Sequence, residues 1–258
     1  MPTDAHADID EYVLASDLDG TLIDHDTPPG EADEKLAEFA ERLAGSNGRL
    51  RLWFNSSRPV ASQRQSLLDV PGLPTPEFQI GAMGTQVCRG DTGEIVEAYG
   101  REQFGEWPRD VVEDICVGQF KLVPHADEMQ TPFKASYDLH DASLVDGIKA
   151  ELEKRGVPFK VVVSSGKDLD VLPPKAGKAS AIQWLVQHGG LAPESVVVSG
   201  DSANDLDMFV KPFRGIVVGN GHDELKRQAP ERGGEVYLAK KHVSAGVVEG
   251  LLHFGVLR

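Results

Sequence analysis

Two aspartates, Asp17 and Asp19, directly follow a short apolar run at residues 12–16. A carboxylate can attack phosphorus and form an acyl-phosphate with the chain, which divides one difficult displacement into two easier ones. A second carboxylate beside it can protonate the leaving alkoxide and then deprotonate the attacking water. The pair therefore predicts a phosphoryl-transfer site, with Asp17 as the nucleophile and Asp19 as the general acid and base.

Three further segments offer groups that could hold a phosphate. Gly20 and Thr21 fit a tight turn that brings backbone N–H groups close to an anion. Ser56 follows a second apolar run, and its hydroxyl could hold phosphate oxygens. Lys178 comes directly after Gly177 at the start of an expected helix. A cation at this position would neutralise the nucleophile and the transferring group.

A polar loop at residues 200–205 supplies two more carboxylates, Asp201 and Asp205. Together with Asp17 and the main-chain carbonyl of Asp19, they offer the hard oxygen ligands that Mg²⁺ prefers. Hydrolysis of a phosphate monoester is among the slowest uncatalysed reactions, so several electrostatic devices must act together. We therefore expect Mg²⁺ as the cofactor.

Each of these signals is weak by itself. A lone Asp-x-Asp is most often a solvated turn or a helix cap. The segment that begins at Gly177 is most often a plain helix start, and it lacks the upstream glycine of a nucleotide-binding P-loop. Together the four segments indicate a phosphoryl-transfer site, because each one follows an apolar run or opens a helix.

The elements that must position these residues alternate between strands and helices. We expect strands at residues 12–16, 50–54, 78–80, 195–199 and 215–218. We expect helices at residues 31–43, 60–70, 178–188 and 243–254, with another starting at residues 205–210. This alternation predicts an α/β fold with a doubly wound, Rossmann-like parallel sheet that binds ligands at the carboxyl ends of its strands.

The pattern changes between residues 88 and 171. A hairpin is expected around residues 91–93, helices near 107–118 and 143–155, and strands near 133–139 and 159–164. A second mixture of strands and helices with its own apolar residues predicts an inserted, smaller α/β cap domain. The catalytic core would then comprise residues 1–87 and 172–258, and the cap residues 88–171 would set substrate specificity.

The composition excludes several kinds of partner. The chain of 258 residues has 41 acidic against 26 basic residues and a net charge of −15. We therefore expect no binding to nucleic acid or to a membrane surface. The two cysteines lack metal-ligand spacing, and the first residues are polar and acidic, which favours a cytoplasmic protein without a signal peptide. A monomer and a weak homodimer both remain open.

The motifs at residues 17–21, Ser56, Lys178 and residues 200–205 resemble those of the haloacid dehalogenase superfamily of phosphatases. Segments 164–173, 133–137, 215–220 and 245–254 resemble the sucrose-phosphatase-like branch of that superfamily. Within the branch, residues 54–58 and 78–85 look most like the mannosylfructose-phosphate phosphatases. The family usually has glycine where this chain has Ser57 and Ala203, and we expect modest effects from these two small-for-small changes.

The resemblance implies a Mg²⁺-dependent phosphatase of a disaccharide phosphate, such as mannosylfructose-phosphate or sucrose-6-phosphate, that proceeds through an aspartyl-phosphate. The alternatives are a phosphatase of another sugar phosphate, of the mannosyl- or glucosyl-phosphoglycerate type, and a non-catalytic sugar-phosphate-binding regulator on the same fold. The expected substrate-binding residues are Gly20, Thr21, Ser57, Arg58, Gly84, Lys134, Lys167, Asp168, Asn204 and Asn220.

Simpler interpretations of the cap residues stay open. Lys134 could be an ordinary surface lysine. Lys167 and Asp168 could form a turn ion pair that contributes little to stability. His125 and Glu128 lie in a polar loop and could face the sugar or only the solvent.

Overall fold

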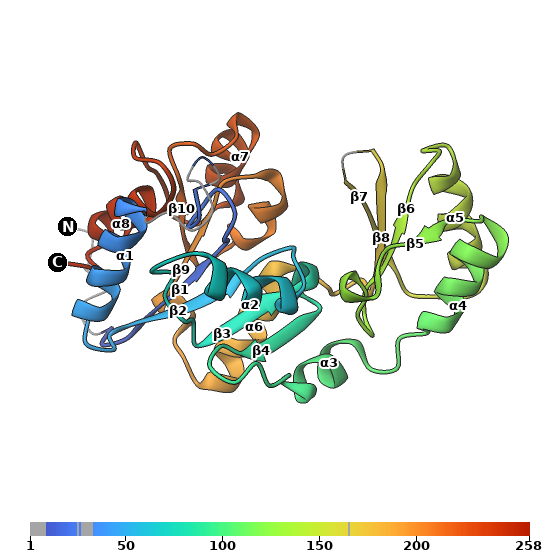
Figure 1. The fold of residues 1–258 in the computed structure, drawn as a ribbon, viewed down its shortest axis with the longest axis horizontal. Coiled ribbons are helices and arrows are strands. Elements are labelled where there is room, and N and C mark those ends of the chain that lie inside the picture. The colour runs from blue at the N-terminus through green and yellow to red at the C-terminus, as the bar shows by residue number, and fades with distance from the viewer. Residues whose placement is uncertain (1–8, 25, 27–32, 165) are drawn as a thin grey trace.

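The chain is organised around two β-sheets that lie in separate units (Figure 1). The structure is a computed structural model that describes residues 9–24, 26, 33–164 and 166–258. The larger sheet has seven strands in the order β11-β10-β9-β1-β2-β3-β4, and the smaller sheet has four in the order β5-β6-β8-β7. The predicted α/β fold with a doubly wound core and a smaller α/β unit is confirmed.

The larger sheet is parallel except at one edge. Its strands are β1 (Tyr12–Ser16), β2 (Leu50–Asn55), β3 (Phe78–Gly81), β4 (Gln86–Arg89), β9 (Val196–Gly200), β10 (Arg214–Val217) and β11 (Val236–Leu238). Strand β4 is antiparallel to β3, and the other neighbours are parallel. All five residues of β1 are buried, as expected for a central strand covered on both faces. The residue that follows this strand, Asp17, therefore lies at the carboxyl end of a central strand of the sheet.

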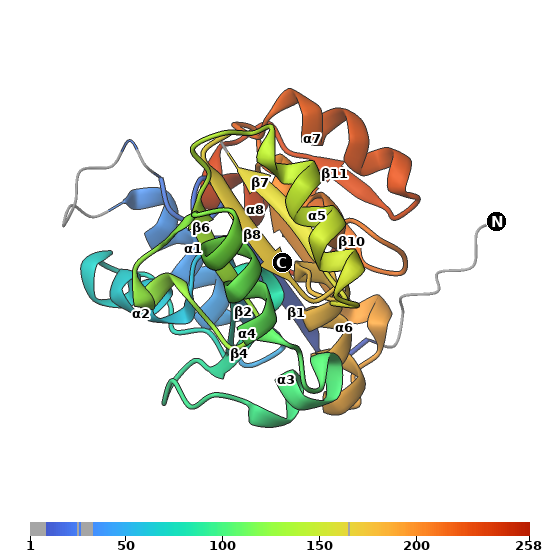
Figure 2. The same ribbon diagram turned by 90° about the vertical axis from the view of Figure 1, so that its right-hand side faces the viewer.

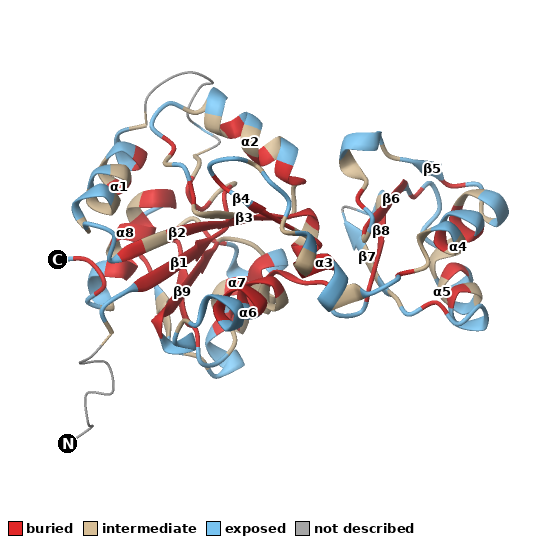
Figure 3. Ribbon diagram, turned by 90° about the horizontal axis from the view of Figure 1, so that it is seen from below, coloured by how far each residue is buried: buried red, intermediate tan, exposed pale blue. Residues whose placement is uncertain are grey.

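Helices cover both faces of the larger sheet (Figure 3). One face packs against α1 (Glu34–Gly45) and α8 (Val243–His253), with Phe39 and Val247 in a shared apolar cluster. The other packs against α6 (Lys178–Gly189) and α3 (Glu97–Phe104). Helices α2 (Val60–Asp69) and α7 (Asp223–Gln228) complete the layers. Apolar surface is thus removed from water on both sides, which is the main force that holds this unit together.

Two helices differ from the limits predicted for them. The expected start at Glu31 lies outside the described residues, and α1 begins at Glu34, where the Asp33 carboxylate accepts the Lys35 N–H at 2.9 Å. The helix expected at residues 205–210 is instead a 3₁₀ turn at Ala203–Met208. The Asp205 side chain accepts the Ser202 N–H, which tightens this turn from its start.

The smaller unit has an antiparallel sheet with helices on one face. Its strands are β5 (Val123–Pro124), β6 (Ala135–Asp138), β7 (Lys160–Ser164) and β8 (Asp168–Leu172), and its helices are α4 (Arg109–Glu113), which runs on as a π-helical turn to Gln119, and α5 (Leu144–Lys154). Figure 2 shows these two helices in front of the sheet. Tyr137 and Leu169 point into the apolar core beneath the helices. Because side chains alternate along a strand, their neighbours lie on the opposite face.

The segment that joins the two units begins later than residue 88. Strand β4 pairs with β3 in the larger sheet. The Tyr99 ring of α3 packs edge-to-face on Trp184 of α6, with ring centroids 5.3 Å apart. The expected limit at residue 88 therefore falls inside a strand of the larger sheet, and the chain leaves this unit after Phe104. It returns after β8, whose last residue is Leu172, close to the expected limit at residue 171.

Within the described residues, no helix combines the length and the apolar character needed to cross a lipid bilayer.

Candidate active site

The four predicted motifs meet at the carboxyl end of the central strands. Asp17 follows β1 directly, is 5% exposed, and donates its N–H to the Ser199 carbonyl at 3.0 Å. The register pairs Ser16 of β1 with Phe54 of β2 and with Ser199 of β9. Residues that follow these three strands therefore end side by side, as the parallel topology predicts.

Lys178 connects two of these motifs. Its Nζ, 3% exposed, donates to Asp17 Oδ1 at 2.8 Å and to Asp205 Oδ1 at 2.6 Å. Lys178 is the first residue of α6, and its carbonyl accepts the Asn55 side-chain amide at 3.1 Å. Asn55 was not predicted, although it is the first polar residue after the apolar part of β2. The lysine is thus fixed at both its backbone and its ammonium group.

The acidic loop folds around Asp205, whose side chain is fully buried. Its Oδ2 accepts the backbone N–H groups of Asp201 at 3.0 Å and Ser202 at 3.1 Å. The Thr21 hydroxyl donates to Asp201 Oδ1 at 3.2 Å. Gly20 has φ +76°, and a Cβ there would lie 2.8 Å from Asp201 Oδ2. The turn after β1 and the acidic loop therefore approach so closely that Gly20 leaves no room for a side chain.

Three carboxylates share one ammonium at this point. Burial raises the pKa of Asp17 to about 8, against the attraction of Lys178 and with added repulsion from Asp205. Burial and the charge of Asp205 also raise the pKa of Asp201. Burial opposes the charge of Lys178, yet the two carboxylates beside it raise its pKa above the ordinary value, so it stays protonated. Burial is the larger cause of both aspartate shifts, and three carboxylates against one ammonium also leave an excess of negative charge.

That excess fits a divalent cation. Oxygens of Asp17, Asp201 and Asp205 lie within 4.8 Å of one another. Hard carboxylate oxygens are the donors that Mg²⁺ and Ca²⁺ take. The chain therefore has an acidic cluster that could bind a metal ion, formed by three of the residues predicted for it.

Asp19 lies beside this cluster and faces another partner. Its Oδ2 is 2.7 Å from Arg58 Nε, and its side chain is one-third exposed. Arg58 also donates from Nη1 to the Ser66 hydroxyl at 3.0 Å, which anchors it on α2. The buried Ser56 hydroxyl accepts the Arg58 N–H at 3.2 Å. The second and the first motif are thus joined by an ion pair that sequence reasoning did not anticipate.

A cavity of about 570 Å³ opens between the two units next to Lys178. Ser57, Arg58, Met83, Lys178, Asn204 and Asp207 line it from the larger unit, and His125, Met129, Lys134, Val162, Asp168 and Asp170 line it from the smaller one. Its size is in the range of small-molecule sites. Both units therefore line one binding space, which meets the acidic cluster at Lys178.

Lys134 is buried in the wall that the smaller unit contributes. It is 3% exposed, and its Nζ lies 2.8 Å from Asp170 Oδ1. The Ser136 hydroxyl donates to the same oxygen at 2.6 Å and accepts from Lys134 Nζ. Strand alternation places Ser136 and Asp170 on the face opposite the apolar core. The surface-lysine interpretation of Lys134 is therefore wrong.

Lys167 and Gly84 do not line the cavity. Lys167 is exposed in the turn before β8, and Asp168 pairs with His125 rather than with Lys167. Gly84 has φ +78°, and a Cβ there would lie 2.0 Å from the Gly177 carbonyl oxygen. Gly84 therefore permits a close backbone contact at the start of α6, one residue before Lys178.

Asn220 acts on the site through the backbone. Its side-chain amide donates to the Gly20 carbonyl at 2.7 Å, and its Oδ1 accepts the Val243 N–H at 2.8 Å. It ties the turn after β1 to the start of α8. Ser57 and Ala203, which replace the usual family glycines, are not among the described residues with positive φ, so the backbone accommodates both side chains.

Sequence reasoning missed four charged residues of the cavity wall, which are Lys160, Asp170, Asp207 and Arg232. Burial raises the pKa of Asp207, whose Oδ2 accepts the Ala179 N–H at 3.4 Å. The only signal for Asp207 in the sequence is an acidic residue among apolar neighbours. Lys160 and Arg232 gave no local signal, because their place in the wall depends on how the two units meet.

An aspartate and a lysine at the edge of a parallel core sheet, beside an acidic loop and under a smaller α/β unit, define a phosphatase of the haloacid dehalogenase type. Residues 10–255 match the sucrose-6F-phosphate phosphohydrolase family, and the chain belongs to this family. The resemblance predicted from the motifs is therefore confirmed.

Individual relatives agree with this assignment. The chain is 32% identical to the mannosylfructose-phosphate phosphatase of Agrobacterium fabrum, over 95% of this chain and 97% of that protein. It is 30% identical to the probable sucrose-phosphatase 3a of Arabidopsis thaliana over 95% of its own length, but spans only 60% of that plant protein. The sucrose-phosphatase from Synechocystis sp. PCC6803, solved in complex with sucrose and phosphate, has a TM-score of 0.77 and 28% identity, covering 95% of this chain and 98% of that one.

Proposed function

We propose that this protein is a Mg²⁺-dependent phosphatase of a disaccharide phosphate, such as mannosylfructose-phosphate or sucrose-6-phosphate. The observation that carries the proposal is the buried Asp17–Lys178–Asp205 arrangement beside a cavity that both units line. The names of the relatives and the ligands of the Synechocystis structure support the sugar-phosphate class.

The proposed reaction has two steps. An Asp17 carboxylate oxygen attacks phosphorus, the bond from phosphorus to the sugar oxygen breaks, and Asp19 gives its proton to that oxygen. Asp19 then takes a proton from water as the water attacks phosphorus, and the bond to Asp17 breaks to release phosphate. Asp19 must leave its ion pair with Arg58 to reach the sugar oxygen and then the water.

The buried cations and acids would hold charge in place during both steps. Lys178 neutralises the carboxylate that attacks and the oxygens of the transferring group. Asp17, the Asp19 carbonyl, Asp201 and Asp205 would hold Mg²⁺, which supplies positive charge to the phosphoryl oxygens when bound. Ser56 and the backbone of Gly20 and Thr21 would bind the remaining phosphate oxygens.

The sugar would occupy the cavity above. We assign its contacts to Ser57, Arg58, Lys134, Asp168 and Asn204, which line the space. Asn220 would act by positioning the Gly20 turn. Lys167 and Gly84 do not line the cavity, and we assign them no contact with the sugar. Cys88 and Cys116 are both free and buried, which supports the further proposal of a cytoplasmic location.

The test is phosphate release from a panel of sugar phosphates, with and without Mg²⁺. Asp17→Asn should abolish turnover while the unfolding midpoint stays near that of the wild type. Asp146→Asn, which changes an exposed aspartate of α5, is the matched control and should keep full activity. Substantial turnover by Asp17→Asn would refute the nucleophile, and no Mg²⁺-dependent release from any ester would favour a non-catalytic regulator. A preference for phosphoglycerate esters would show that the substrate is instead of the mannosyl- or glucosyl-phosphoglycerate type.

A further inference from the structure

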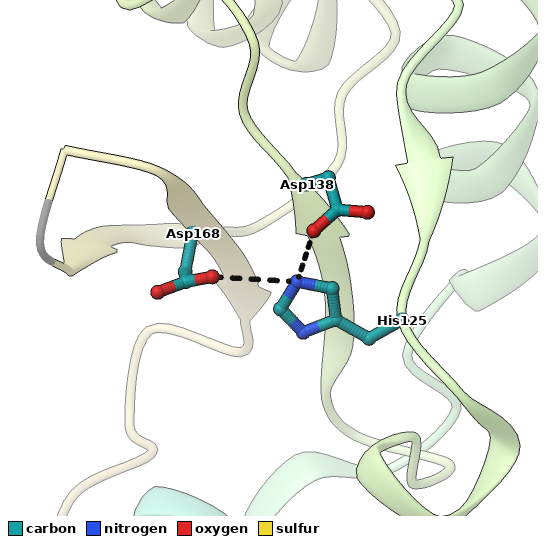
Figure 4. Close-up of side chains that lie close together, drawn as sticks. All are labelled: His125, Asp138 and Asp168. Atoms are coloured by element: carbon teal, nitrogen blue, oxygen red, sulfur yellow. Dashed lines mark ion pairs between the residues drawn. The ribbon is translucent and has the colours of Figure 1, made fainter.

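The wall of the smaller unit contains a second group of potential ligand atoms, formed by His125, Asp138 and Asp168 (Figure 4). The His125 Nε2 atom lies 3.2 Å from Asp138 Oδ1 and 3.5 Å from Asp168 Oδ1. Figure 4 shows the imidazole between the two carboxylates. His125 and Asp168 also line the cavity, so this group of atoms borders the binding space.

The two aspartates oppose each other directly across neighbouring strands. The antiparallel register pairs Asp138 of β6 with Asp168 of β8. Like charges at directly opposite positions destabilise a sheet. A cation between them removes the repulsion, and the imidazole alone does this poorly because its Nε2 carries at most one proton for two carboxylates.

The two separations from His125 Nε2 are close to those between ligands of a metal ion. Two ligands about 2.0–2.1 Å from a tetrahedral metal lie about 3.4 Å apart. The two observed separations, 3.2 and 3.5 Å, fall on either side of this value. One imidazole nitrogen with carboxylate oxygens selects a first-row transition ion such as Zn²⁺, whereas Mg²⁺ and Ca²⁺ prefer oxygen ligands alone.

The histidine is held in place by its backbone. His125 donates its N–H to the Ser136 carbonyl at 3.0 Å, and its carbonyl accepts the Gln130 side-chain amide at 3.1 Å. Gln130 also bonds both backbone groups of Ser136, at 2.8 and 3.0 Å. The ring therefore projects from a fixed loop toward two strand positions, which lowers the entropy cost of ordering a site.

We propose that His125, Asp138 and Asp168 form a binding site for a first-row divalent transition ion, of the Zn²⁺ type, on the smaller unit. The site shares no residue with the acidic cluster around Asp17, and it shares only Asp168 with the sugar contacts proposed above. Three protein ligands leave at least one coordination position open. Because His125 and Asp168 line the cavity, that position would be taken by water or by a hydroxyl group of a molecule bound there.

Co²⁺ is the probe, because its visible absorption reports the coordination directly. The full chain is titrated with Co²⁺ in excess Mg²⁺, which occupies the acidic cluster. We expect one equivalent of Co²⁺ to bind with a low-coordinate spectrum. His125→Gln and Asp138→Asn should each weaken binding by more than about tenfold, since even residues that only orient metal ligands have effects of that size.

Two further variants separate the possible outcomes. Asp127→Asn removes an exposed acid of the same unit, and Asp17→Asn removes the catalytic cluster; both should keep the Co²⁺ spectrum. Asp138 is 64% exposed, so Asp138→Asn should fold even if His125→Gln does not. Equal Co²⁺ affinity of the wild type and the folded Asp138→Asn would overturn the proposal. So would loss of the signal in Asp17→Asn.

Discussion

Replacing Lys178 by methionine should damage both folding and turnover. The change leaves Asp17 and Asp205 buried and without the ammonium that lies 2.8 and 2.6 Å from them. Removing one partner of a buried ion pair costs about 3–5 kcal/mol. Removing one preorganised electrostatic donor costs about 10²–10³ in turnover. We therefore expect a fall in the unfolding free energy of about 3 kcal/mol or more without metal, and at least a hundredfold slower phosphate release.

The assay combines urea unfolding with released-phosphate kinetics, each with Mg²⁺ and with a chelator. Mg²⁺ should stabilise Lys178→Met more than the wild type, because it supplies charge that the variant lacks. Lys175→Gln changes an exposed lysine three residues earlier and is the matched control. Turnover and stability of Lys178→Met equal to those of Lys175→Gln would refute the reasoning, because Lys178 would then carry no electrostatic role.

Three other changes follow from the same geometry. Gly84→Ala should lower the unfolding free energy by at least about 1 kcal/mol and slow turnover, because a Cβ would lie 2.0 Å from the Gly177 carbonyl at positive φ; a wild-type urea midpoint would contradict this. Without metal, the folded state keeps the proton of Asp17 up to about pH 8, whereas the unfolded state releases it near pH 4. The unfolding free energy of the wild type should therefore fall relative to that of Asp17→Asn as pH rises through this range, by up to about 1.4 kcal/mol per pH unit. If urea unfolding gave the same pH dependence for both proteins, the pKa shift of Asp17 would be absent. Lys134→Gln should raise KM for disaccharide phosphates and leave kcat on a small aryl phosphate nearly unchanged. An equal loss of activity on both substrates would show that the ion pair of Lys134 with Asp170 has only a structural role.

The larger sheet could be predicted where its strands are continuous apolar runs. Strand β1 is buried at every position, so its sequence carries the signal in each residue. Strand β4 was expected only as an arm of the hairpin at residues 91–93, and β11, which is three residues long and lies at an edge, was not predicted. The limit of the smaller unit was placed too early because α3 is mostly polar, with Tyr99 and Gly100 as its only buried residues.

The meeting of the four motifs could be predicted because topology alone brings the ends of parallel strands together. Partners that depend on packing could not, such as Arg58 beside Asp19 and Lys134 beside Asp170. Lys167 was predicted together with Asp168 from the resemblance of residues 164–173 to the family. Alternate residues of a strand lie on the same face, so Asp168 and Asp170 both face the cavity, whereas their neighbour in sequence Lys167 does not line it.

The charge of the whole chain is a poor guide to the ligand of this cavity. The chain carries a net charge of −15, which by itself would repel an anionic ester. Five basic side chains nevertheless line the cavity against three acidic ones, the basic residues being Arg58, Lys134, Lys160, Lys178 and Arg232. Solvent-exposed charges farther away than about 8–10 Å are largely screened at physiological ionic strength, so a phosphate in the cavity responds mainly to this lining. Acidic residues therefore dominate the chain as a whole and the acidic cluster around Asp17, whereas basic residues gather in the cavity where the two units meet.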